Sequence, residues 1–178
     1  MKTWVTSRWK NPCRPGQLSV EINIRSYDLV WILHLVGDVH QPLHAISRYT
    51  REIPNGDAGG NAESVIPATG ETISLHAYWD GLFGGYSSAY GAIFDAGDRD
   101  GLASITPNPM ASQVSDPDEW IRESSELAKL FAYAPPVSPG TNAVFLSRKY
   151  ETDARNIARS QAALAAARLA NVLNAALK

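Results

Sequence analysis

The four histidines of this chain all fall within residues 34–76, and the other 135 residues contain none. His34 is followed four residues later by Asp38, and His76 is followed four residues later by Asp80. Residues four apart lie one above the other on a helix, so each pair would aim an imidazole and a carboxylate at one point. The pattern therefore predicts two helices packed so that their His-Asp faces meet.

The first His-Asp pair lies on an apolar stretch with helical spacing. The apolar positions that share one face are Leu29, Ile32, Leu33 and Val36. An unpaired Asp38 would be costly to bury on such a helix. A single His-x-x-x-Asp pair is more often a hydrogen-bonded pair or a solvated surface than a metal site. Two such pairs, with His44 just beyond the turn expected at Pro42, favour a metal ion, and zinc binds these ligand types at about 2.0–2.2 Å.

Periodicity and helix breakers predict one irregular segment followed by one helical domain. Residues 1–25 hold several breakers and no sustained period, so we expect an irregular N-terminal segment. Residues 26–178 predict a single, mainly α domain with few strand signals. The expected helices run from Ser26, as the N-cap, to Pro42, and over 73–82, 87–94, 117–132 and 144–176, with a loop over 47–72 that can include a short hairpin.

Composition and charge narrow the classes of function. The chain has 178 residues, of which 44% are hydrophobic and 19% charged, an ordinary balance for one globular domain. The formal net charge is −2, so no basic excess points to nucleic-acid binding, although a bound metal can supply positive charge. The single cysteine, Cys13, excludes an internal disulfide. No apolar run of about 18 residues occurs, so no membrane span is expected. Residues 1–13 hold no apolar core of signal-peptide length, so no signal peptide is expected in this sequence.

Three segments resemble the zinc-dependent single-strand-specific nucleases, which include 3′-nucleotidases and share a helical fold with bacterial zinc phospholipase C. Residues 34–44, His-Leu-Val-Gly-Asp-Val-His-Gln-Pro-Leu-His, resemble the central motif of that family. Residues 57–61, Asp-Ala-Gly-Gly-Asn, resemble its Gly-Gly-Asn loop, and residues 75–80, Leu-His-Ala-Tyr-Trp-Asp, resemble its second ligand helix. Order and spacing agree as well, and the resemblance covers about residues 26–178.

The resemblance implies a zinc centre and assigns its ligands. His34 and Asp38 would bind one zinc ion, with Asp38 placed to contact a second metal of a close pair. His44, His76 and Asp80 would bind another zinc ion. These five side chains would come from two helices and the bend between them.

The same resemblance implies the chemistry. Asp38 and Asn61 are the candidate catalytic residues, and Asn61 would hydrogen-bond to the scissile phosphate or to the attacking water. Zinc lowers the pKa of a bound water and stabilises charge on the phosphate oxygens. The implied substrates are single-stranded DNA or RNA and nucleotides, whose exposed bases stack on aromatic side chains. Tyr78 and Phe83 are candidates for stacking, but core packing is the expected role of both.

Family members carry further metal ligands ahead of the first motif, beginning with a terminal tryptophan. Here 33 residues precede His34, and none of them is histidine. We therefore expect this chain to correspond to the C-terminal part of the fold, lacking its N-terminal portion, with reduced activity when alone. Apolar surface left exposed would favour an N-terminal partner or self-association. His40 is predicted to lie beside the ligands or on the surface, without binding metal.

Two other functions remain open from the sequence. The chain is alternatively a catalytically inactive remnant that binds zinc. It is alternatively a lipid phosphodiesterase on the same fold. The Gly-Gly-Asn loop favours nucleic acid over lipid by family likeness alone.

Overall fold

A computed structural model describes residues 18–84, 86, 88–140 and 142–176. Of the expected irregular segment 1–25, residues 1–17 lie outside this description. Residues 18–25 are helical, because the first helix, α2, spans Leu18–Asp38. The predicted start at Ser26 is therefore wrong: no proline or glycine interrupts the chain from residue 18 to Val36, and a serine inside a helix costs little.

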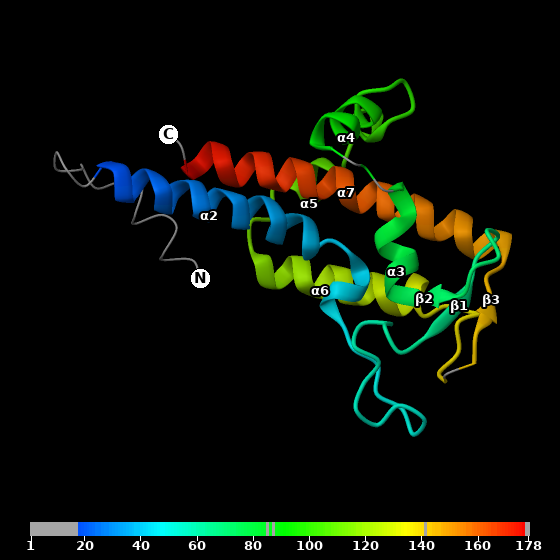
Figure 1. Cartoon of the computed structure of the whole chain (residues 1–178). Helices are drawn as coiled ribbons and strands as arrows, with labels where there is room; N and C mark the ends of the chain where they lie inside the picture. Colours follow the sequence, from blue (N-terminus) through cyan, green and yellow to red (C-terminus); the bar gives the residue numbers. More distant parts are fainter. Residues whose placement is uncertain (1–17, 85, 87, 141, 177–178) are drawn as a thin grey trace.

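Three helices form the body of the fold (Figure 1). α2 lies beside the long C-terminal helix α7 (Arg148–Ala176), and α6 (Pro117–Leu127) packs against the 3-10 turn η1 (Pro42–Ala45). α6 begins as predicted, with the Asp116 side chain accepting from the backbone of Asp118, and continues into a π-helical turn over Ala128–Ala132. The chain turns after Asp38 and at Pro42, as the proline predicted.

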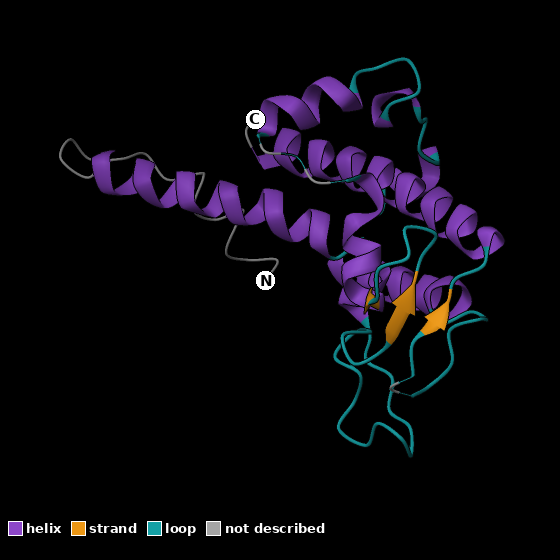
Figure 2. Cartoon of the chain, turned by 45° about the vertical axis from the view of Figure 1, so that its right-hand side comes forward, coloured by secondary structure: helices purple, strands orange, loops and turns teal. Residues whose placement is uncertain are grey.

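A small sheet closes one end of the body (Figure 2). Its strands are β1 (Ser64–Ile66), β2 (Ile73–Ser74) and β3 (Val144–Phe145), in the order β2-β1-β3. β1 pairs antiparallel with β2 and parallel with β3, so β1 is the central strand. The helices predicted to start at residues 73 and 144 therefore start later, because these apolar positions pair with β1 instead.

Short elements complete the chain. The helix α3 (Leu75–Asp80) follows β2 directly and runs into the 3-10 turn η2 (Gly81–Phe83). The helix predicted over 87–94 is α4 (Ala89–Ala96), which stands off the body in Figure 1. The turn η3 (Leu102–Ser104) and the short helix α5 (Pro109–Ser112) follow in the chain, and both contact α7. Among the described residues, no helix has the length and apolarity to cross a membrane.

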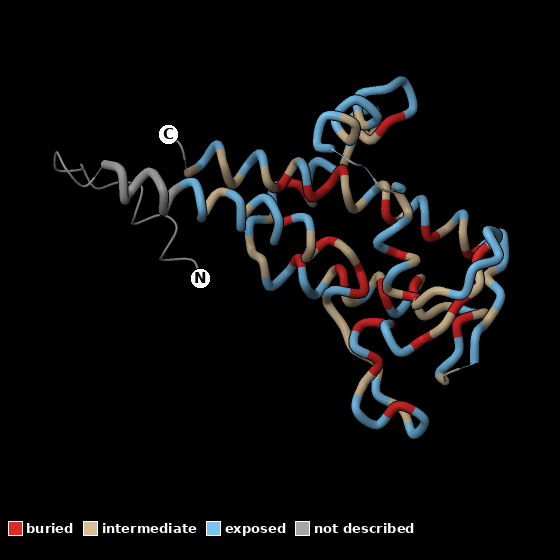
Figure 3. Tube along the Cα trace, in the orientation of Figure 1, coloured by how far each residue is buried: buried red, intermediate tan, exposed pale blue. Residues whose placement is uncertain are grey.

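The buried residues gather where α3, α6 and α7 meet the sheet (Figure 3). Trp79 of α3 is 2% exposed, and its indole donates to the hydroxyl of Tyr150, which donates in turn to the carbonyl of Ala132. Trp79 is therefore a core residue. The core cluster comprises Leu43, Val65, Leu75, Trp79, Ala128, Ala132, Val137, Tyr150 and Ala154. The fold is mainly α, as predicted.

One face of α2 leaves large apolar side chains in solvent. Tyr27 and Val30 are each 63% exposed, and Trp31 and Leu33 are nearly half exposed. Isolated apolar residues on a surface are ordinary, but four on neighbouring turns form a patch. Coverage of this patch by an N-terminal partner or by a second copy remains a prediction.

Candidate metal centre

The five predicted ligands converge on one region. His34 Nε2 lies 3.1 Å from Asp38 Oδ2 at the end of α2. His44, on η1, lies between two carboxylates, with Nδ1 3.7 Å from Asp38 Oδ1 and Nε2 3.3 Å from Asp80 Oδ1. His76 Nε2 lies 3.4 Å from Asp80 Oδ2 on α3. The i, i+4 spacing and the turn at Pro42 thus bring together side chains from three elements.

Three of these residues lie close enough to one another to form a candidate site for one ion. One ligand atom each from His44, His76 and Asp80 lies within 4.8 Å of the other two. The two imidazole rings are stacked, with centroids 4.9 Å apart and planes 8° from parallel. Two imidazoles and a carboxylate form a donor set that zinc binds, and three protein ligands leave a position for water or substrate.

The ring of His76 is oriented by a backbone carbonyl. Its Nδ1 lies 2.9 Å from the oxygen of Gly59. A carbonyl oxygen only accepts, so Nδ1 carries a hydrogen, and Nε2 is the ring nitrogen that faces Asp80. Metal-binding histidines are commonly oriented in this way, by a hydrogen bond from the other ring nitrogen to a carbonyl oxygen. The residues of this site are therefore compatible with a metal ion.

Asp57 fixes the loop that carries this carbonyl. The Asp57 side chain is fully buried, and its Oδ1 accepts from the backbone of Arg48 at 2.8 Å and of Gly59 at 3.1 Å. The hydroxyl of Tyr133 donates to Oδ2 at 2.6 Å. Burial raises the pKa of Tyr133, and the hydrogen bond to Asp57 raises it further, so the phenol remains a donor. Sequence likeness identified this loop but not the anchoring role of Asp57.

Gly59 needs the absence of a side chain. Its φ of +66° favours glycine, and an added Cβ would lie 2.4 Å from the carbonyl oxygen of Leu43. The loop therefore approaches the backbone of η1 closely. This approach places the ligands His44 and His76 side by side.

Gln41 is a site residue that the sequence reasoning missed. Its Nε2 donates to Asp80 Oδ1 at 2.9 Å, and its Oε1 caps η1 by accepting from Leu43. The amide therefore links the first motif to the last ligand. Its position within residues 34–44 was the available signal, but nothing in the spacing indicates that it reaches Asp80.

His40 is buried and takes no part in the ligand group. Its Nδ1 donates to the carbonyl of Val36 at 2.7 Å, so Nε2 accepts from Arg168 Nη1 at 2.9 Å. Arg168 Nη2 lies 2.8 Å from Glu123, and the guanidinium lies over the ring of Trp120. Burial lowers the pKa of His40, and the Arg168 charge lowers it further. The surface alternative for His40 is therefore wrong.

The remaining predicted residues lie around the centre. Asn61 is exposed, and its Nδ2 donates to the carbonyl of Ala58 at 2.8 Å. Tyr78 packs against the core, and burial raises its pKa to about 12. Phe83 lines an apolar cavity between α2 and α7. The expected packing role of Tyr78 agrees with its position. Phe83 is only partly buried and does not belong to the core cluster, so core packing of Phe83 stays a prediction.

A cleft of about 660 Å³ opens beside the ligand group. Its lining includes Asp38, His44 and His76, together with apolar residues such as Leu35 and Ile121. Its volume is within the usual range of ligand pockets, about 300–1,000 Å³. A substrate in this cleft would contact the candidate metal ligands directly.

Comparisons with known proteins identify the family of this chain. The S1/P1 Nuclease family matches residues 17–178. Nuclease S1 of Aspergillus oryzae (strain ATCC 42149 / RIB 40) is 42% identical over 52 residues. That match covers 29% of this chain and 15% of Nuclease S1.

Proposed function

Because this chain belongs to the S1/P1 nuclease family, we propose that it hydrolyses phosphodiester bonds of single-stranded nucleic acid at a zinc centre. One observation carries the proposal. His44, His76 and Asp80 present their ligand atoms within 4.8 Å of one another, with the tautomer of His76 set by Gly59. An ordinary His-Asp pair on a protein surface does not need a backbone carbonyl to orient the histidine ring.

The donor set supports zinc as the metal. His44, His76 and Asp80 would hold one ion, and His34 with Asp38 would supply two ligands to a second. When bound, zinc acts as a Lewis acid that activates water for attack and neutralises charge on the phosphate. The formal net charge of −2 gives the chain no general attraction for phosphate, so a metal-based site is the favoured means of binding it.

The residues of this chain orient the reacting groups. Gln41 fixes Asp80 Oδ1, and Gly59 fixes the ring of His76. Asp38, between His34 and His44, joins the two ligand sets. Asn61 uses one amide hydrogen on Ala58 and retains a second donor and an acceptor oxygen, which suit a phosphate oxygen and a water respectively.

The test is a zinc count combined with cleavage assays on the full chain. We expect metal-dependent cleavage of a single-stranded oligonucleotide, abolished by a chelator. Asp80→Asn should lose zinc and activity. The matched control Asp153→Asn, which changes a carboxylate on α7 that pairs with Lys149, should retain both.

Other outcomes would reject parts of the proposal. Purified protein without bound zinc at neutral pH would contradict the metal centre. Zinc binding without cleavage would identify an inactive remnant. Release of a phospholipid head group, with the oligonucleotide left intact, would identify a lipid phosphodiesterase.

A further inference from the structure

We propose that the cavity between α2 and α7 binds a nucleobase through an amino group that donates to Gln161 Oε1. This inference rests on the proposed function, because it names a binding subsite for the same nucleic-acid substrate. The cavity differs from the cleft beside the metal ligands, and the sequence likeness assigns it no role.

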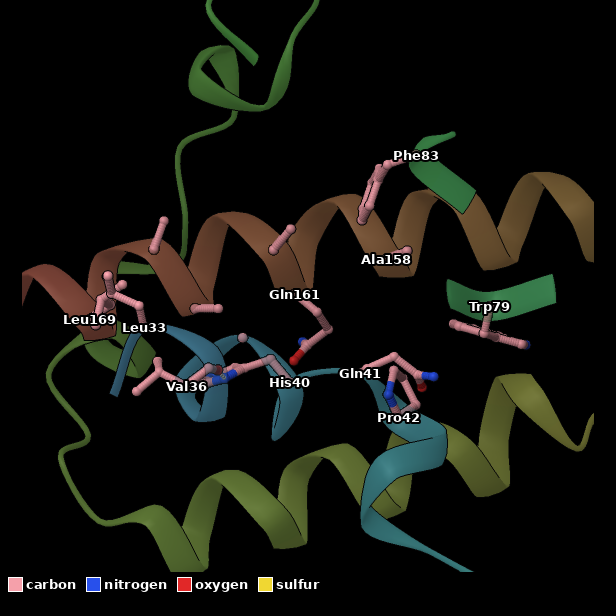
Figure 4. Close-up of a pocket in the computed structure, with 14 residues that line it drawn as sticks. Leu33, Val36, His40, Gln41, Pro42, Trp79, Phe83, Ala158, Gln161 and Leu169 are labelled. Carbon is pink, nitrogen blue, oxygen red and sulfur yellow. Dashed lines mark hydrogen bonds between the residues drawn. The ribbon is translucent and has the colours of Figure 1, made fainter. Parts of the chain in front are cut away.

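The cavity has the size and lining of a site for a flat ring. Its volume is about 350 Å³, at the small end of ligand pockets, which run from about 300 to 1,000 Å³. Phe83 supplies aromatic surface, and alanines of α7 form much of one wall. Trp79 also borders the cavity, but it is a core residue that is only 2% exposed. Figure 4 shows Gln161 projecting from α7 toward His40 and Gln41. No lysine, arginine or carboxylate lines the cavity, so a neutral ring fits better than a phosphate.

Gln161 contributes a buried polar atom, Oε1, to this lining that has no hydrogen-bond partner among the described residues. The other polar lining groups are engaged: His40 uses both ring nitrogens, and Gln41 bonds to Asp80 and Leu43. A buried acceptor without a partner destabilises the fold, and the terminal torsion of glutamine is soft enough to turn it toward a ligand. This buried acceptor is satisfied by a ligand group that donates, such as the amino group of adenine.

The cavity adjoins the metal centre. Gln41 lines the cavity and also donates to the ligand Asp80. The next residue, Pro42, lines the cavity too, while His44 lines the cleft on the other side of η1. The two spaces therefore flank one turn, which suits a nucleotide whose base and phosphate bind in different places.

The experiment compares adenosine with purine riboside, which lacks only the amino group, by calorimetry on the full chain without zinc. We expect adenosine to bind about five- to tenfold more tightly, the ratio expected for one hydrogen bond. Gln161→Leu should bind the two nucleosides equally, and it should melt at a higher temperature than the wild type because an unpaired buried acceptor is removed. Ala162→Leu, which fills the cavity, should abolish binding of both.

Equal affinities in the wild type, or no binding of either nucleoside, would overturn the proposal. Retained binding in Ala162→Leu would also overturn it, because the ligand would then lie elsewhere. The zinc count and the oligonucleotide assay are independent readouts. A chain that discriminates between the nucleosides but neither binds zinc nor cleaves would support the base site and reject the proposed function. A chain that binds zinc and cleaves but does not discriminate would support the proposed function and reject the base site.

Discussion

Replacing Asp57 by asparagine should destabilise the fold and weaken metal binding together. The buried carboxylate accepts from Tyr133, from the backbone of Arg48 and Gly59, and from Ser47 at 3.3 Å. An asparagine is uncharged, and its NH2 group, itself a hydrogen-bond donor, would face one of these donor groups. A hydrogen bond to a charged group contributes about 1.5–3 kcal/mol, against about 1 kcal/mol for a neutral one. Losing one bond and weakening the others predicts a cost of about 3–5 kcal/mol.

Tyr133→Phe is the matched comparison. It removes only the bond to Oδ2 and leaves both backbone bonds to Oδ1 in place. We expect it to cost about 1.5–3 kcal/mol. Urea unfolding followed by circular dichroism, without added metal, measures both free energies of unfolding.

The two variants should separate in zinc affinity. In Asp57→Asn the hydrogen bond that anchors Gly59 is weakened, so the carbonyl of Gly59 holds the ring of His76 less firmly. A loss of this kind typically reduces metal affinity by about 10- to 100-fold. Tyr133→Phe should bind zinc almost as the wild type does. An Asp57→Asn protein that unfolds within about 1 kcal/mol of the wild type would refute the anchoring role. Equal zinc loss in both variants would refute the orientation argument.

Three further outcomes follow from buried or constrained residues. Arg168→Met should lower the free energy of unfolding in urea by about 3–5 kcal/mol, because it leaves Glu123 without its charged partner. Arg168→Lys should not restore this stability, because an ammonium group lacks the planar fork of donors of a guanidinium. Gly59→Ala should cost at least about 2 kcal/mol through positive φ and a backbone clash. The control Gly70→Ala, at φ +86° with open space around it, should cost about 1–2 kcal/mol. The pKa of Tyr78 is raised to about 12 in the folded protein. Its contribution to stability should therefore be complete below about pH 10 and should be lost as the pH rises through about 12. Ultraviolet titration of the wild type and of Tyr78→Phe measures this ionisation.

Local spacing predicted the two His-Asp contacts of the candidate metal centre, because residues four apart on a helix lie on one face. The pairs His34-Asp38 and His76-Asp80 are each set by one helix, and both meet as expected. The helical class also followed from apolar periodicity. The start of α2 was not predicted correctly, because a serine such as Ser26 can either cap a helix or lie inside one. The absence of helix breakers before Ser26, from residue 18 on, is what allows the helix to begin at Leu18.

The partners of buried polar groups were not predictable in the same way. The contact between His40 and Arg168 joins residues 128 positions apart. Pairing of Val65 with Val144 likewise depends on a parallel contact between distant segments. Periodicity in the sequence reports which face of an element is apolar, and it carries no information on which distant group a charged side chain meets.

The candidate metal centre is held by directional bonds more than by apolar packing. Its carboxylates are well exposed, with the Asp80 side chain 49% accessible, so packing alone does not fix them. The segment that carries the ligands is instead bound by buried polar groups on either side. Ser124 donates to the carbonyl of Val39 at 2.6 Å, and Arg48 donates to the buried Glu63. Apolar contacts are non-directional, whereas a hydrogen bond requires a defined distance and angle. Ligand geometry in this chain therefore depends on side chains that bind no metal.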